Sequence, residues 1–137
     1  MRAVLDPNVT ISALLWRDGT PARVLRLWVE GTYELVCSPK LLDELRRALT
    51  YPKLTTRIHP GEADALLTLL GDEALVQDDP RTPPSVTSAD PDDDYLIALA
   101  EQSRSLLVSG DSDLLDLADQ APIYSPREFL EYLTPEV

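Results

Sequence analysis

Short apolar segments alternate with helix-start signals along almost the whole chain. The apolar runs at residues 2–5, 33–37 and 106–109 have the length and composition of buried strands, and residues 74–77 and 122–124 are weaker candidates. Segments with helical signals separate these runs. Strands that are separated by helices pair in parallel, with the helices packed on the faces of the sheet. The pattern therefore predicts a three-layer α/β/α sandwich with a mostly parallel central sheet.

The expected helices begin at a short polar residue followed by proline. Such pairs are Thr20-Pro21, Ser38-Pro39, Asp90-Pro91 and Ser125-Pro126. The polar side chain caps the helix, and proline suits its first turn. Gly31 is expected to end the helix that starts at Thr20, and Gly71 the helix over residues 61–70. Residues 51–59 are less regular, and residues 78–91, with four prolines, are expected to form a loop.

Length and composition limit the classes of protein to which this chain can belong. A length of 137 residues fits one compact domain, which we expect to span residues 1–137. The net charge of −12 argues against broad electrostatic adhesion to a nucleic-acid backbone. The single cysteine excludes a disulfide framework and a cysteine zinc cluster. No apolar run approaches the roughly 18 residues of a membrane helix, and the N-terminus lacks a signal-peptide pattern, so we expect no membrane association and a cytoplasmic location.

Acidic residues stand at the ends of the confident strands. Asp6 directly follows the strand over residues 2–5. Asp111 comes soon after the strand over residues 106–109, and Asp113 lies two residues further on. Open parallel sheets bind ligands beyond the carboxyl ends of their strands. Asp111 has an ordinary explanation too, because it can cap the short helix that follows.

Helical geometry separates two neighbouring acids in the helix after the second strand. At about 100° per residue, Glu44 borders the apolar stripe of Leu41, Leu45 and Ala48. Asp43 points to the opposite side and should face water. Glu44 can therefore lean toward the edge of the core, although a solvated helix position would explain it equally simply.

A run of aspartates marks the start of the later acidic helix. Asp93 shares a face with Ile97 and Ala100, whereas Asp94 shares one with Glu101. Asp93 is therefore the better inward candidate. Helix capping by Asp90 and a favourable helix dipole would also account for the run.

Asp6, Glu44, Asp93 and Asp111 can converge at one end of the sheet. Four clustered carboxylates repel one another, which raises some of their pKa values, and a divalent ion relieves the repulsion. Ligands that are all oxygen select Mg²⁺ or Mn²⁺ over softer metals. Such ions can activate water and stabilise a phosphate under attack.

Four segments, in this order, resemble the PIN-domain family, and especially the VapC-like toxins of bacterial toxin–antitoxin pairs. They are VLDPNVTISALL (4–15), SPKLLDELRRAL (38–49), DPDDDYLIALA (90–100) and LLVSGDSDLL (106–115). The resemblance implies that Asp6, Glu44, Asp93 and Asp111 are the catalytic, metal-holding acids. It also implies auxiliary roles for other positions, namely Asn8, Asp94 as the alternative third ligand, Ser109 in place of a frequent threonine, and Asp113.

The same resemblance implies a function. Such proteins are metal-dependent endoribonucleases, restrained by an antitoxin protein that covers the site, and many are homodimers. Pro7 departs from the threonine or serine common in the family, but proline suits the first turn of a helix. The motifs leave open which of Arg17, Arg46 and Arg47 contacts RNA.

Other classes of protein remain as alternatives. A receiver-type signalling domain also has an acidic Mg²⁺ pocket, but it would need a lysine after the last strand, where this chain reads YSPREF. A catalytically inactive PIN module would bind only protein, and a PIN-like DNA nuclease usually carries extra helical insertions. No G-x-S-x-G elbow or glycine-rich nucleotide loop occurs in the sequence.

Overall fold

The computed structural model of the chain describes residues 1–134, so residues 135–137 of the expected domain lie outside the described part. Five strands form one sheet in the order β3-β2-β1-β4-β5. All four pairings between neighbouring strands are parallel, as predicted. The strands are β1 (Arg2–Leu5), β2 (Glu34–Cys37), β3 (Leu75–Val76), β4 (Leu106–Val108) and β5 (Ile123–Tyr124).

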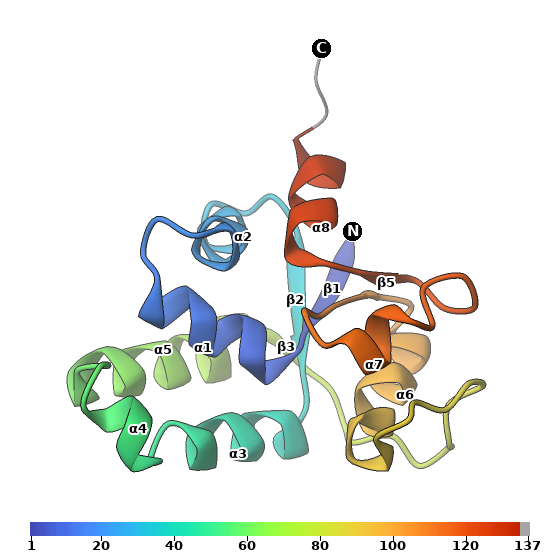
Figure 1. Cartoon of the computed structure of the whole chain (residues 1–137), viewed down its shortest axis with the longest axis horizontal. Coiled ribbons are helices and arrows are strands. Elements are labelled where there is room, and N and C mark those ends of the chain that lie inside the picture. Colours follow the sequence, from blue (N-terminus) through green and yellow to red (C-terminus); the bar gives the residue numbers. More distant parts are fainter. Residues whose placement is uncertain (135–137) are drawn as a thin grey trace.

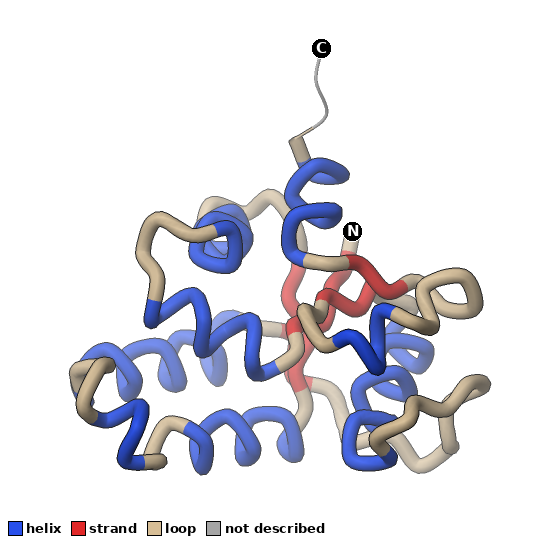
Figure 2. Tube along the Cα trace, in the orientation of Figure 1, coloured by secondary structure: helices blue, strands red, loops and turns tan. Residues whose placement is uncertain are grey.

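Helices cover the sheet on both sides, which confirms the layered α/β fold. In Figure 1, α1 to α5 lie to the left of the strands and α6 and α7 to the right, and Figure 2 shows the strands between these helical layers. The helices are α1 (Pro7–Leu15), α2 (Thr20–Val29), α3 (Pro39–Ala48), α4 (Pro52–Thr55), α5 (Pro60–Glu73), α6 (Asp94–Ser103), α7 (Ser112–Leu115) and α8 (Pro126–Leu133). A 3₁₀ turn, Pro91–Asp93, precedes α6. No helix within residues 1–134 is both long and apolar enough to cross a membrane.

The central strand sets where the polar residues gather. β1 pairs with β2 on one side and with β4 on the other, so the carboxyl ends of these three strands form one edge. Each of them is followed at once by a buried polar residue, namely Asp6, Ser38 and Ser109. The backbone N–H of Asp6 still donates to the Val108 carbonyl at 2.9 Å. The sheet itself therefore fixes Asp6 and Ser109 side by side.

Several helix ends follow the sequence signals. The Ser38 hydroxyl accepts the Leu41 N–H at 3.3 Å, and Ser125 forms a reciprocal capping box with Glu128. Gly31 ends α2 with a φ of +87°, a conformation that favours glycine. The N–H of Thr32 then donates to the Leu27 carbonyl, which satisfies one of the free carbonyls at the helix end.

Other boundary predictions were wrong. Thr20 does not cap α2, because it already lies inside the helix and Gly19 occupies the cap position. Gly71 does not end α5, which continues to Glu73. One glycine costs a helix only about 1 kcal/mol, so the packing of α5 outweighs it. The segment expected to be irregular, residues 51–59, contains the short helix α4.

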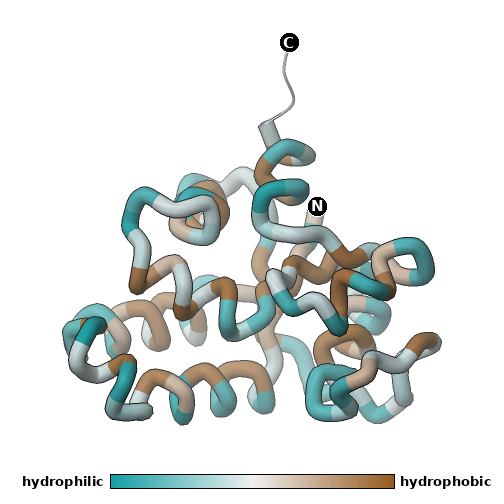
Figure 3. The backbone as a smooth tube through the Cα atoms, viewed as in Figure 1, coloured by the Kyte–Doolittle hydropathy of each residue, from teal (hydrophilic) through white to brown (hydrophobic). Residues whose placement is uncertain are grey.

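The core joins the sheet to both helical layers, and the central strands carry much of the hydrophobic sequence (Figure 3). Phe129 of α8 is fully buried, and its ring meets the edge of Tyr33 with centroids 5.0 Å apart. Of the two tryptophans of the chain, Trp28 is buried. Trp16 is 59% exposed and lies outside the core, because α1 ends one residue before it.

Replacing Phe129 by alanine should lower the free energy of unfolding by about 3–5 kcal/mol, because the change leaves a cavity beside Tyr33. Urea denaturation followed by circular dichroism measures this loss. Tyr132→Ala is the matched control in the same helix, since Tyr132 is 53% exposed, and it should cost less than about 1 kcal/mol. Equal losses in the two variants would contradict the packing described for α8.

Candidate active site

Asp6 is the most buried acid at the carboxyl edge of the sheet. It is only 4% exposed, and it caps α1 by accepting the Asn8 N–H at 3.0 Å. Its other oxygen accepts the Ser109 hydroxyl at 2.8 Å. Burial raises the pKa of Asp6, the two hydrogen bonds lower it, and the charges of Asp111 and Glu44 raise it further. Asp6 therefore lies within the electrostatic reach of two other acids from distant parts of the chain.

Ser109 connects Asp6 to the loop that carries Asp111. Its Oγ donates to Asp6 and accepts the Asp111 N–H at 3.0 Å. Asp111 in turn caps α7, because its Oδ1 accepts the Asp113 N–H at 2.9 Å. The capping role that the sequence allowed for Asp111 is therefore present in the structure. The cap fixes the carboxylate at the sheet edge.

Asp93 faces this pair from the start of α6. Burial raises the pKa of its carboxyl group from the ordinary 3.8 to about 7, with further contributions from Asp6, Asp111 and Asp90. The side chains of Asp93 and Asp111 lie within hydrogen-bonding reach of each other. Asp94 has a different partner, because its Oδ1 accepts the Ser88 N–H at 2.8 Å and so anchors the preceding loop.

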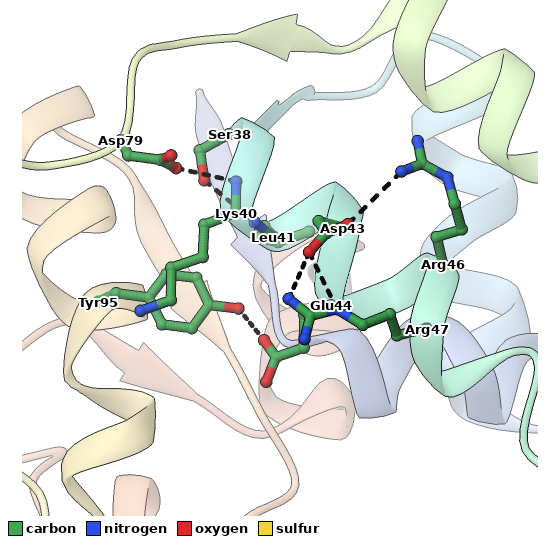
Figure 4. Close-up of polar contacts among 9 residues, drawn as sticks. All are labelled: Ser38, Lys40, Leu41, Asp43, Glu44, Arg46, Arg47, Asp79 and Tyr95. Carbon is green, nitrogen blue, oxygen red and sulfur yellow. Dashed lines mark hydrogen bonds and ion pairs between the residues drawn. The ribbon is translucent and has the colours of Figure 1, made fainter.

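Glu44 reaches the same edge from α3. Its carboxylate accepts a hydrogen bond from the Tyr95 hydroxyl, whereas Asp43 points the other way and pairs with Arg46 and Arg47 (Figure 4). The opposite directions of Asp43 and Glu44 match the helical geometry of the sequence. Burial and the bond to Glu44 raise the pKa of Tyr95, so its hydroxyl stays protonated and donates.

Tyr95 is the functional candidate that the sequence reasoning missed. It follows the aspartate run and precedes an apolar helix body, so its position is typical of a core aromatic residue. Only the approach of α6 to α3 brings the hydroxyl to Glu44. A tyrosine in the first turn of a helix that starts at a carboxylate edge is the signal that would have singled it out.

The four sequence-predicted acids thus gather at one edge without forming a closed cage. The electrostatic coupling joins Asp6 to Glu44 and Asp111, and Asp93 to Asp6 and Asp111. Within residues 1–134, no three acidic, histidine or cysteine side chains are close enough to hold one ion as they stand. Glu44 is turned toward Tyr95. The all-carboxylate donor set nevertheless has the chemistry that Mg²⁺ and Mn²⁺ prefer.

Two clefts flank the carboxylate edge. One, of about 340 Å³, is lined by Asn8, Ser12 and Asp111 among others. The second, of about 250 Å³, is lined by Lys40, Glu44, Arg47, Tyr51 and Asp92. A larger cavity of about 480 Å³ lies between α2 and α8, but none of the four acids lines it. Asp111 and Glu44 therefore each line one of the two smaller clefts.

Comparison with known proteins agrees with this fold. Residues 2–113 match the family model of the PIN domain. The chain is also 31% identical, over 143 aligned positions, to the uncharacterized protein MJ1680 of Methanocaldococcus jannaschii. That alignment covers 96% of this chain and 90% of the relative. A layered α/β fold with an acidic sheet edge defines the class, and this chain belongs to the PIN-domain family, whose members are generally nucleases.

The strand order also separates this protein from the receiver-type alternative. Receiver domains have the flavodoxin-like order 2-1-3-4-5, with the third strand central. Here the first strand is central, in the order 3-2-1-4-5. The acids accordingly surround the end of β1, where Asp6 lies.

The raised pKa of Asp93 makes folding stability depend on pH. The folded state binds a proton more tightly than the unfolded state, so stability is lost as the pH rises from 3.8 to about 7. In chelator at about pH 8, Asp93→Asn should therefore be more stable than the wild type, by on the order of 1 kcal/mol because solvent screens a half-exposed group. Urea denaturation across this pH range measures the difference. A variant with the wild-type pH dependence would contradict the electrostatic coupling.

Proposed function

We propose that this PIN-domain protein is an endoribonuclease that depends on Mg²⁺ or Mn²⁺. The observation that carries the proposal is the cluster of mutually repelling acids Asp6, Asp93 and Asp111. Burial, together with this repulsion, raises the pKa of Asp93 to about 7. Structural carboxylates are usually paired with cations, but here acids from three separate elements face one another. A divalent cation removes that repulsion by accepting the same carboxylate oxygens as ligands.

Asp6, Glu44, Asp93 and Asp111 would hold the metal. When bound, the ion would supply Lewis acidity to a phosphodiester and to a water molecule. Other residues of the chain hold these carboxylates in position. Ser109 and the Asn8 N–H fix both oxygens of Asp6, while Tyr95 fixes Glu44. Asp113 is the second residue of α7 and its N–H bonds to Asp111, and Asn8 lines the adjoining cleft, so both serve as auxiliary residues.

The charge of the protein supports a requirement for metal. At a net charge of −12, and with acids at the site, the bare edge repels a phosphodiester. Bound cations would reverse that local charge and so allow the phosphate that is cleaved to approach the acids. Asp94 anchors the loop before α6, and we assign it a supporting role in place of a ligand role.

We further propose that the protein is the toxin of a toxin–antitoxin pair in the cytoplasm. The order of its four motifs, which resembles the VapC-like toxins, supports this role. A cognate antitoxin would cover the carboxylate edge, and the exposed Trp16 beside α1 would lie in a homodimer contact. A short DNA-binding protein encoded in the neighbouring reading frame is the expected partner. Co-expression of the two proteins should relieve the growth arrest that the toxin alone causes.

Asp6→Asn should reduce the cleavage of RNA by more than about a hundredfold in Mg²⁺ or Mn²⁺, because it removes a central charge that binds metal. The fold should persist, since asparagine retains an oxygen for the Asn8 N–H and a similar shape beside Ser109. Gel-based cleavage assays measure the activity, and circular dichroism measures the fold.

Asp72→Asn is the matched control, because Asp72 is an exposed acid of α5 and should be dispensable. Chelation of the metal should abolish wild-type cleavage to the same extent as Asp6→Asn. Full cleavage in chelator would overturn the metal mechanism. A folded wild-type protein that cleaves no RNA in either metal would instead favour the inactive, protein-binding PIN module.

A further inference from the structure

One face of α3 carries charged residues at helical spacing. Lys40, Glu44 and Arg47 follow one another at intervals of four and three residues, so they project from the same side. Tyr51 lies just beyond the end of α3, where it is the N-cap residue of α4. Figure 4 shows Lys40 and Arg47 on either side of Glu44. We call these four residues the α3 strip. A carboxylate of the candidate site is thus placed between two cations.

The α3 strip lines a cleft that contains one acid of the candidate site, Glu44. Its four residues, together with Asp92, line the cleft of about 250 Å³ beside the sheet edge. Tyr51 is 53% exposed, so its ring is accessible from solvent. Glu44 and Asp92 repel a phosphate from their part of the cleft. An anionic chain in it therefore has to lie against Lys40 and Arg47.

Both cations are available to an anion. Lys40 Nζ lies 4.5 Å from the centroid of the Tyr95 ring, and no carboxylate within residues 1–134 lies within 4.0 Å of it. Arg47 is paired with Asp43, with 3.0 Å between Nε and Oδ2, but its side chain is 72% exposed. An exposed ion pair contributes less than about 1 kcal/mol to stability, so a phosphate can displace Asp43 as the partner of this guanidinium.

The other arginines considered from the sequence lie elsewhere. Arg17 is paired with Glu62 at 2.7 Å, and Glu62 belongs to α5. Arg46 lines a mainly apolar cleft between α3, α4 and α5. Among the three candidates, Arg47 is the one that shares a cleft with an acid of the candidate site.

We propose that the α3 strip binds the unpaired nucleotides of RNA next to the cleaved bond. This inference rests on the proposed ribonuclease function. Lys40 and Arg47 lie about 10 Å apart along the helix axis, whereas one strand of a duplex advances about 3.4 Å per phosphate, so they contact different phosphates. Tyr51 offers its ring to a base, which stacking permits only for unpaired nucleotides. The strip thus selects single-stranded segments.

The test is binding of a fluorescein-labelled single-stranded RNA, followed by anisotropy, to protein that carries Asp6→Asn and therefore leaves the RNA intact. Adding Lys40→Ala and Arg47→Ala should weaken binding at least about tenfold, since each loses a charged contact. The slope of log affinity against log salt should fall by about one for each contact. Tyr51→Ala should also weaken binding, and Tyr51→Phe should not, because stacking uses the ring.

Two controls separate binding from structure. Asp43→Asn breaks the same ion pair as Arg47→Ala but keeps the guanidinium, so RNA binding should be equal or tighter. Arg23→Ala removes one positive charge from the cavity between α2 and α8, so it should leave affinity unchanged. In the active protein, the Lys40 and Arg47 variants should raise KM for RNA more than they lower kcat.

The outcomes separate this inference from the proposed function. Unchanged affinity and salt slope in the Lys40→Ala, Arg47→Ala variant would overturn the α3 strip while leaving cleavage intact. If RNA binding depends on Lys40 and Arg47 but the wild-type protein cleaves no RNA, the α3 strip is supported as an RNA-binding surface and the proposed ribonuclease activity is contradicted. Loss of affinity in Asp43→Asn equal to that in Arg47→Ala would assign Arg47 a structural role only.

Discussion

Repulsion among carboxylates at the carboxyl edge of the parallel sheet is the constraint on which the rest of this structure depends. Asp6 is buried at the end of the central strand, and Asp93 and Asp111 face it from two other elements. Such an arrangement costs stability, because each charge is partly desolvated and close to others of the same sign. The sheet and the helix caps nevertheless hold the groups in place through Ser109 and backbone N–H donors. A divalent cation bound at this edge, as we propose, would relieve the repulsion.

Much of this arrangement follows from local rules that operate within a few residues. Short apolar runs separated by helices dictate a parallel sheet, and parallel strands place Asp6 and Asp111 at the same edge. Helical geometry alone separates the outward Asp43 from Glu44, as the structure shows. The partners of Asp93 and Asp94 likewise agree with the faces that their spacing predicts. Whether the four acids act together as ligands remains a proposal.

Features that depend on packing between distant elements could not be predicted from the sequence. The hydroxyl of Tyr95 meets Glu44 only because α6 approaches α3, and no spacing rule connects residues 51 positions apart. The arginine beside the site could not be chosen for the same reason, since Arg46 and Arg47 are neighbours that face different clefts. Helix boundaries failed where packing outweighed a weak local signal, as at Gly71. The site therefore combines predictable positions with a supporting layer that only the fold defines.

The most direct test of the central claim is an NMR titration of the Asp93 side-chain carboxyl carbon, once in chelator and once in saturating Mg²⁺. In chelator the carboxyl should titrate with a pKa of about 7. In Mg²⁺ the pKa should fall well below that value, because the cation favours the charged form. A pKa near the ordinary 3.8 in chelator, unmoved by Mg²⁺, would contradict the account.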